Sequence, residues 1–316
     1  MSLQNLVTLK YQLTKSLKVD HIVDDILKLK NSIELVKQSV PNIDEEHEAY
    51  LTNLVEHYTQ VVTTISKPVA DLKNYLRFVD KEINIYSQKL YGSNYQLEEK
   101  YGSPDDIRNY RQVFIADDVK SVVTQRILLH TDWKYPALEI GCRDGEWTKH
   151  LVAADPLYIV DRHREFLTSA AEQFPEEYQR RLRAYYLDKH NLLMLPRNQF
   201  GFIFSWSYFN YVGMDTIKQY LQQMFLLLRP GGVCMFSYNN GETPVGASLA
   251  ENLFQAYMPR SILESLAQSL GFEIYQATDL DGGTSWIELK KPGVLNTIKT
   301  HQVLGEILPR NISPLG

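Results

Sequence analysis

The sequence predicts an α/β fold: a seven-stranded, mostly parallel sheet with helices on both faces, preceded by an α-helical, coiled-coil-like region. Two observations predict it. From residue 136 onward, short apolar segments of strand length alternate with segments of helical period, as in parallel sheets covered on both faces. Earlier residues instead keep a helical period with almost no glycine. We expect a helical hairpin or coiled-coil arm over 1–95, the α/β domain over 96–290 and a C-terminal tail over 291–316.

The composition limits the class of protein. With 316 residues, 44% of them hydrophobic, the chain can bury one full core and a second, smaller unit. A net charge of −5 gives no basic surface for nucleic acid or an anionic membrane. No signal peptide or membrane-spanning run is visible. Cys142 and Cys234 lie in predicted core elements, which fits a reducing compartment. We expect a cytoplasmic protein that binds no membrane.

Two apolar stripes predict the helices of the arm. The first has the spacing of a coiled-coil seam and ends before Pro41: Ile22, Ile26, Leu29, Ile33, Val36 and Val40. The second has one irregular step, around Pro68, where we expect a kink; it comprises Leu51, Leu54, Tyr58, Val61, Ile65, Val69, Leu72, Leu76, Val79, Ile83, Tyr86 and Leu90. Either these helices fold on their own chain as a hairpin, or they form a self-associating stalk. Because stripes this narrow need a partner surface, we expect a homo-oligomer.

Turn residues and periodicity divide the rest of the chain. Tyr91-Gly92-Ser93-Asn94 and residues 101–104 predict a linker, and 105–129 predict a helix. We expect strands over 137–140, 157–161, 184–187, 200–204 and 232–238, and helices over 146–154, 164–174 and 215–228. At the end, apolar segments over 272–278 and 284–290 flank Asp281-Gly282-Gly283, which predicts a hairpin and a terminal antiparallel pair.

A glycine loop follows the first predicted strand. Residues 137–148 read Ala-Leu-Glu-Ile-Gly-Cys-Arg-Asp-Gly-Glu-Trp-Thr, a layout that lets the backbone approach a ligand and point amide donors at it. Asp161 closes the next strand, where an acid can accept the two hydroxyls of a ribose. An aspartate after a strand also serves as a helix cap, but the preceding glycine loop favours ligand binding.

These residues resemble a known family. Residues 105–290 look like a class I S-adenosylmethionine-dependent methyltransferase of the small-molecule type, similar to methyltransferase type 11 proteins. Five segments match in order: 139–145 resembles the acid-x-Gly-x-Gly-x-Gly motif, followed by Asp161, 187–196, 200–205 and the Pro230-Gly231-Gly232 turn. The resemblance implies a Rossmann-like domain that binds S-adenosyl-L-methionine. The cofactor-binding residues that it implies are Glu139, Gly141, Cys142, Gly145, Asp161, Arg162, Asp188, Lys189 and Ser205.

Arg143 departs from this family's pattern, which has a glycine at the middle of the loop. A side chain that turns outward leaves the backbone path intact, and because Gly141 and Gly145 remain, we expect that arrangement. A side chain that blocks the loop would leave a domain kept for architecture. The alternative function is therefore a structural or assembly protein, for example one of a virus particle or tail, that uses the domain without catalysis.

The sequence limits the methyl acceptor mainly by excluding classes of substrate. Ser205-Trp206-Ser207-Tyr208 is not the Pro-Pro-aromatic run that holds a flipped adenine, and no Pro-Cys pair offers a nucleophile for cytosine, so we expect no DNA-base substrate. No spacing of His or Cys suggests a metal site. What remains is direct displacement onto a small molecule or a protein group, driven mainly by orientation. The catalytic residue stays open, with His190, Tyr208 and Tyr238 as weak candidates.

Overall fold

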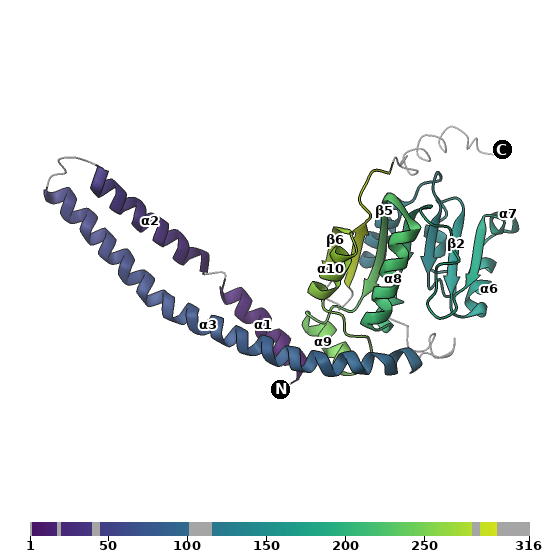
Figure 1. The fold of residues 1–316 in the computed structure, drawn as a ribbon, viewed down its shortest axis with the longest axis horizontal. Coiled ribbons are helices and arrows are strands. Elements are labelled where there is room, and N and C mark those ends of the chain that lie inside the picture. Colours follow the sequence, from purple (N-terminus) through teal and green to yellow (C-terminus); the bar gives the residue numbers. More distant parts are fainter. Residues whose placement is uncertain (1, 18–19, 40–44, 101–115, 280–284, 296–316) are drawn as a thin grey trace. The chain divides into compact units, whose positions relative to one another are not determined.

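The computed structural model describes residues 2–17, 20–39, 45–100, 116–279 and 285–295 (Figure 1). The chain divides into two compact units, Met1–Gln88 and Lys89–Gly316. Each unit is described by itself. Within the described residues, no helix is long and apolar enough to cross a membrane.

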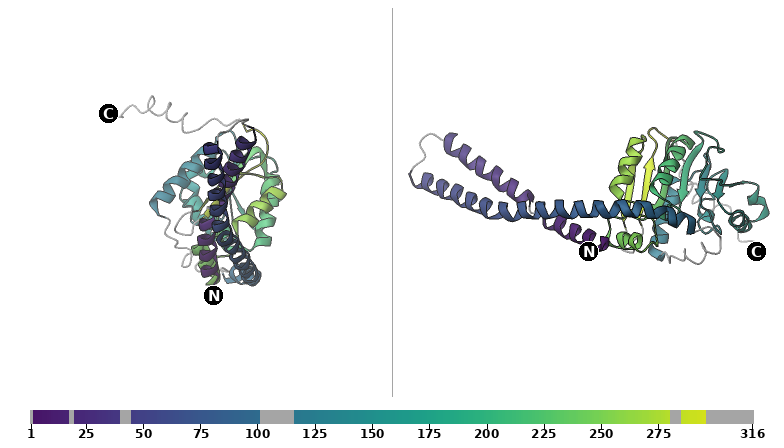
Figure 2. Two further views of the ribbon diagram at one scale, coloured as in Figure 1. Left: turned by 90° about the vertical axis from the view of Figure 1, so that its left-hand side faces the viewer. Right: turned by 60° about the horizontal axis from the view of Figure 1, so that its bottom comes forward.

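The first unit is a helical hairpin. Helices α1 (Leu3–Ser16) and α2 (Asp20–Ser39) lie beside the first part of α3 (Glu45–Lys100), as both views in Figure 2 show. The Lys10 ammonium lies 2.9 Å from the Asp80 carboxylate, and Lys37 donates to the Thr52 hydroxyl at 2.7 Å. The middle of α1 therefore meets α3 around Asp80, and the end of α2 meets α3 near its start, which makes the pairing antiparallel.

The second apolar stripe faces inward along α3. Each of its members is at least partly covered, and Val69 and Val79 are buried. The helix continues through Pro68, which removes one backbone donor. Thr64 and Ser66 donate their hydroxyls to carbonyls one turn earlier, a bond that also bends helices. The first stripe fits less well, since Leu29 is 47% exposed.

The linker predicted at residues 91–94 is wrong, because α3 continues to Lys100. Tyr91 shows the reason: its ring packs against Tyr257, with centroids 5.4 Å apart, within the second unit. A tertiary contact here outweighs the weak helix propensity of Gly92 and its neighbours. Residues 101–104 lie outside the described residues. The predicted helix over 105–129 is observed as α5 (Asp117–His130), and residues before 116 again lie outside the description.

The second unit contains the predicted seven-stranded, mostly parallel sheet. The strands are β1 (Ala137–Ile140), β2 (Leu157–Asp161), β3 (Leu182–Tyr186), β4 (Phe200–Ser205), β5 (Leu228–Tyr238), β6 (Glu273–Asp279) and β7 (Ser285–Lys290). Their order is β3-β2-β1-β4-β5-β7-β6, and β7 runs antiparallel to both of its neighbours. This confirms the Rossmann-like fold class. The turn predicted at 281–283 lies outside the described residues.

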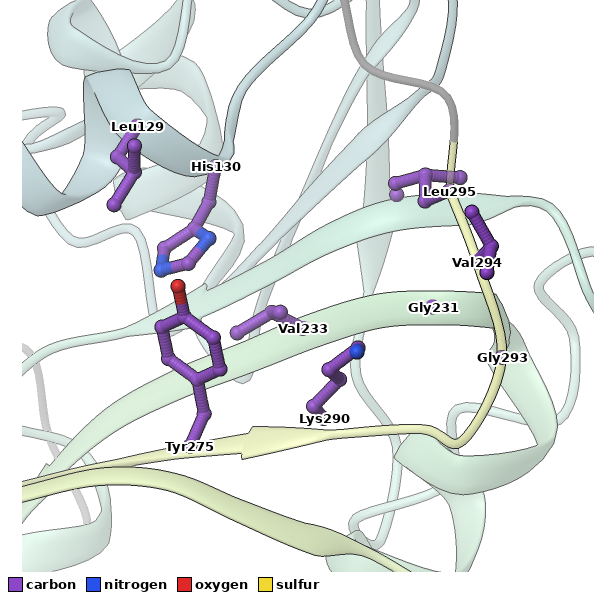
Figure 3. A pocket seen from close by; sticks show the side chains of 10 residues that line it. Leu129, His130, Gly231, Val233, Tyr275, Lys290, Gly293, Val294 and Leu295 are labelled. Carbon is purple, nitrogen blue, oxygen red and sulfur yellow. The ribbon is translucent and has the colours of Figure 1, made fainter.

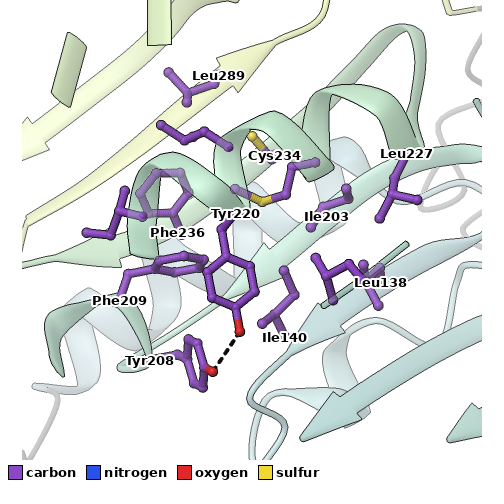
Figure 4. Close-up of a cluster of buried hydrophobic side chains, with 14 of the residues drawn as sticks. Leu138, Ile140, Ile203, Tyr208, Phe209, Tyr220, Leu227, Cys234, Phe236 and Leu289 are labelled. Carbon is purple, nitrogen blue, oxygen red and sulfur yellow. Dashed lines mark hydrogen bonds between the residues drawn. The ribbon is translucent and has the colours of Figure 1, made fainter. Parts of the chain in front are cut away.

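Helices cover both faces of the sheet. The apolar core on one face joins the strands to α8 (Met214–Leu227) and α10 (Arg260–Ser269), with Tyr220 and Phe236 among its fully buried residues (Figure 4). The core on the other face joins them to α5 and α6 (Arg164–Glu172), with Trp286 and Phe204 among its fully buried residues. Two further short helices are α7 (Glu176–Gln179) and α9 (Pro244–Glu251).

One predicted helix is wrong. The segment 146–154 forms only a single 3₁₀ turn, η2 (Thr148–His150). The Trp147 ring is drawn into the core, where it packs on Phe204 and Trp206 with centroids 5.7 and 5.4 Å away. Burial of Trp147 fixes the course of the chain here more strongly than helical periodicity does.

Candidate functional site

The glycine loop lies where the strand order of the sheet reverses. From β1 the chain adds β2 and β3 on one side of the sheet, and then β4 and β5 on the other. In such a sheet, ligands bind in the crevice outside the carboxyl ends of the two strands at the reversal, here β1 and β4. The loop after β1 turns sharply, with φ of 75° at Gly141, 47° at Arg143 and 86° at Gly145. Arg143 therefore holds a left-handed conformation that a glycine would adopt without strain.

Both glycines make room for the protein's own side chains. A Cβ added to Gly141 would lie 2.6 Å from Cδ2 of Tyr208, which follows β4. A Cβ added to Gly145 would lie 3.0 Å from the Cα of Ala170 on α6. The sequence interpretation, which assigned this space to a ligand, missed these two contacts. Tyr208 thus forms a wall directly over the start of the loop.

Asp161 connects the loop to the second strand. Its carboxylate is buried and accepts the Arg143 backbone N–H at 3.2 Å and the His163 backbone N–H at 2.9 Å. The Gly141 N–H donates to the carbonyl of Val160 at 2.8 Å. The structure therefore brings the glycine loop and the predicted ribose acid into direct contact, and Asp161 also holds the chain entering α6. Arg162, the next residue, is half-buried.

Glu139 and Cys142 lie beneath the loop. The Glu139 carboxyl accepts the Thr148 hydroxyl at 2.6 Å, and burial, with the nearby Asp161 charge, raises its pKa to about 8. Burial, and then the charge of Asp161, also raises the pKa of the Cys142 thiol. Both side chains are neutral near pH 7, so the Cys142 side chain is a core residue and only its backbone can face a ligand.

A Glu139→Gln substitution should remove a pH-dependent loss of stability. Because the folded-state pKa is raised, Glu139 favours folding fully below its unfolded pKa, and this contribution is lost as pH rises through about 8. We expect the wild-type free energy of unfolding to fall by a few kcal/mol over that range, since one pKa unit is worth about 1.4 kcal/mol. The free energy of unfolding of the glutamine variant should fall less over the same range. Urea unfolding at pH 5 and pH 9 measures the difference, with exposed Glu172→Gln as the control; equal falls in all three proteins would contradict it.

The Arg143 side chain is partly covered by the protein. The residue is half-buried, and its Nε atom is buried without a hydrogen-bond partner among the described residues. A buried guanidinium nitrogen of this kind marks a place where an anionic or carbonyl oxygen would be favourable.

The loop after β3 carries three further candidates. Asp188 and Lys189 are exposed, whereas the His190 Nδ1 atom lies 3.0 Å from the Tyr220 hydroxyl. Gln223 of α8 fixes this loop by donating to the carbonyl of His190 at 2.9 Å. The Tyr208 hydroxyl lies 2.8 Å from the Tyr220 hydroxyl, as the dashed line in Figure 4 shows, and 3.4 Å from His190.

Tyr220 is a site residue that the sequence interpretation missed. It lies on the buried face of α8 between apolar residues, and periodicity alone assigns it to the core. The only signal was chemical: a buried tyrosine hydroxyl needs a hydrogen-bond partner. Burial, and then Tyr208, raises the pKa of Tyr220, so it remains a neutral phenol.

Two other candidates, Ser205 and Tyr238, make contacts within the protein fold. Ser205 donates its hydroxyl to the carbonyl of Ile140 at 2.8 Å, which joins the ends of β4 and β1. Tyr238 is fully buried, and its hydroxyl has no hydrogen-bond partner in the described part of the chain. Burial, followed by the charge of Asp279, raises the pKa of Tyr238. It is therefore separate from the Tyr208, Tyr220 and His190 cluster.

Residues 138–234 match a family described as a methyltransferase domain. The matched residues begin in β1, end in β5, and include the glycine loop, Asp161 and Tyr208. No curated protein matches the sequence.

The chain is also similar to solved structures. One is the N-methyltransferase NodS from Bradyrhizobium japonicum WM9 in complex with S-adenosyl-l-homocysteine, at 16% identity and a TM-score of 0.47, over 63% of this chain and 99% of that one. Another is a S-adenosylmethionine-dependent methyltransferase from Clostridium acetobutylicum ATCC 824, at 16% identity and a TM-score of 0.48, over 58% and 94%. A third, from Mesorhizobium loti, has 13% identity and a TM-score of 0.45, over 56% and 98%.

Proposed function

We propose that the methyltransferase domain binds S-adenosylmethionine and transfers its methyl group to a small-molecule or protein acceptor by direct displacement. The observation that carries this proposal is the contact between the glycine loop and Asp161, through the Arg143 backbone, inside the matched range. Bound S-adenosylmethionine would supply a methyl group on a positively charged sulfur. The protein would lower the activation barrier mainly by holding the acceptor and the methyl group in line, which can contribute many kcal/mol without a dedicated base.

The residues of the loop fit such a ligand. Asp161 is an acceptor-only carboxylate, matched to ribose hydroxyls, and its position is fixed by two backbone donors. Arg143 would hold the carboxylate of the methionine moiety, because its buried Nε atom otherwise lacks a partner in the described residues. Asp188 and Lys189, exposed on the loop after β3, would face the adenine.

On the acceptor side, Tyr208 is the wall residue. Its ring covers Gly141, and its hydroxyl belongs to the cluster with Tyr220 and His190. The Tyr208 hydroxyl and the half-buried His190 ring therefore offer hydrogen-bonding groups next to the loop where the methyl donor would bind. Tyr208 would orient the acceptor, and the His190 ring, hydrogen-bonded to the same cluster, would be the nearest group able to accept its proton.

Calorimetric titration of the full chain with S-adenosylmethionine and with S-adenosylhomocysteine tests the proposal. We expect saturable binding of both. If the folded protein binds neither ligand at millimolar concentration, the result would contradict the enzyme proposal and favour a structural role for the domain.

We also propose that the helical unit associates with a second copy of the chain. Tyr75, Phe78 and Ile85 follow one face of α3 and are 65%, 60% and 44% exposed. Removing such a face from water would stabilise a dimer by about 25 cal/mol for each Å² of apolar area. The proposal extends the coiled-coil interpretation of the sequence to a face that the hairpin leaves uncovered.

A Tyr75→Glu, Phe78→Glu double variant should be monomeric where the wild type is oligomeric, because charge at the centre of an apolar contact opposes burial. Light scattering measures the mass in solution. Arg77→Glu, an exposed change on another face of α3, is the matched control and should keep the wild-type mass. A monomeric wild type would refute the proposal.

The compartment that we propose is the cytoplasm. Cys142 and Cys234 are both free thiols and both buried. Burial raises the pKa of each thiol, so neither is activated for thiol–disulfide exchange. Free cysteines of this kind fit a reducing environment.

A further inference from the structure

A cavity lies at the opposite edge of the sheet from the glycine loop. It has a volume of about 300 Å³ and is lined by the beginnings of β4 and β5, the end of β7 and the end of α5. The register places Val233 opposite Lys290, at the amino end of β5. The proposed methyl-donor site uses the carboxyl ends of β1 and β4, so the two sites do not share residues.

His130, which lines the cavity, belongs to a buried polar cluster. Glu288 is fully buried and accepts hydrogen bonds from Arg126 Nε at 2.7 Å and Nη2 at 2.5 Å. The His130 Nε2 atom lies 2.7 Å from the same carboxylate. Although burial opposes it, hydrogen bonding from His130 and Arg126 lowers the pKa of Glu288, so Glu288 is the acceptor and Nε2 carries the proton.

Aromatic contacts hold the His130 ring in place. It stacks on Phe202, with centroids 5.3 Å apart, and meets the edge of the Tyr275 ring at 5.6 Å. Figure 3 shows the Tyr275 hydroxyl pointing toward the His130 ring, with Val233 and Lys290 beside them. The remaining wall is apolar and includes Leu129 and Leu295.

The charge of the cavity is set by Lys290. Arg126 and Glu288 neutralise each other through two hydrogen bonds. Among the residues that the structure describes, Lys290 has one loose ionic partner, the Glu273 carboxylate at 3.8 Å, and both side chains are partly exposed. Surface pairs of this kind are worth about 0–1 kcal/mol, so the ammonium can exchange this partner for a ligand.

We propose that this cavity is a binding site for a small carboxylate with a planar or branched apolar body. Lys290 would pair with the carboxylate, while Val233, Leu129 and Leu295 would cover the apolar part. The volume lies at the lower end of the range for ligand pockets, which limits the ligand to a small acid. The proposal does not depend on methyl transfer or on S-adenosylmethionine binding.

Benzoate is a suitable probe, and benzamide is its uncharged counterpart. Calorimetry or ligand-observed NMR on the full chain should show that benzoate binds more tightly than benzamide. Lys290→Met, which keeps the stem and removes the charge, should weaken benzoate binding about fivefold, the roughly 1 kcal/mol at the upper end for a partly exposed ion pair. Benzamide binding should stay unchanged. Lys149→Met, an exposed change on the turn η2, is the matched control.

A second variant tests the cavity itself. Leu129 is only partly buried, so Leu129→Trp can fill the space without a severe packing cost. It should abolish binding of both probes while the thermal transition remains. Two results would overturn the proposal: no benzoate binding at millimolar concentration in folded wild type, or equal benzoate affinity in the wild type, Lys290→Met and Leu129→Trp. Because neither probe resembles S-adenosylmethionine, either result leaves the proposed function intact.

Discussion

Replacement of Asp161 by alanine is expected to reduce the affinity for S-adenosylmethionine and for S-adenosylhomocysteine by about a hundredfold or more. Two ribose hydroxyls would lose a charged acceptor, and each such hydrogen bond is worth about 1.5–3 kcal/mol. The backbone N–H groups of Arg143 and His163 would also lose their acceptor, so the loop itself would loosen. Calorimetric titration measures the loss directly.

Two variants separate binding from folding in this experiment. Asp161→Asn keeps one carbonyl oxygen and should lie between the wild type and Asp161→Ala. Glu165→Gln removes an exposed acid from the first turn of α6 and should bind like the wild type. If Asp161→Ala is folded and keeps full affinity, Asp161 is only a cap for the loop and the donor site lies elsewhere.

Gly141→Ala is expected to destabilise the domain by about 3 kcal/mol. A left-handed conformation costs a residue with a Cβ about 1–2 kcal/mol, and overpacking adds about 1–3 kcal/mol. The overpacking arises because the new Cβ would lie 2.6 Å from the Tyr208 ring, while φ at this position is 75°. Urea unfolding measures the change.

A double-mutant cycle divides this cost between backbone and packing. In a Tyr208→Ala background the ring is gone, so Gly141→Ala should cost only the backbone part, about 1–2 kcal/mol. An equal cost in both backgrounds would show that Tyr208 does not press on the loop. Gly271→Ala is the matched control, since its φ is 95° but its nearest contact, Phe225, lies 3.3 Å away.

Strands were the elements that local sequence predicted best. The expected bounds of β1 and β2 agree with the structure, because each is a short apolar run whose side chains are buried on both faces of the sheet. Burial of that kind depends on composition over a few residues. The helix expected after the glycine loop failed for the opposite reason, since burial of Trp147 depends on Phe204 and Trp206, which come from another strand.

The tertiary structure also corrected the turn at residues 91–94. Glycine and asparagine there favour a turn locally, but the packing of Tyr91 on Tyr257 extends α3 instead. No local pattern contains that contact, because the two rings come from distant parts of the chain.

By itself, the sequence determined the α/β class and the position of the glycine loop and Asp161 at the ends of adjacent strands, because apolar periodicity and glycine placement are local properties. Only the tertiary structure decided what surrounds them. It placed Tyr208 over Gly141, joined Tyr208 to Tyr220 and His190, and buried Glu139 as a neutral acid. The reason is physical: hydrogen bonds, pKa shifts and close contacts depend on which distant side chains meet, and the sheet order alone brings these together.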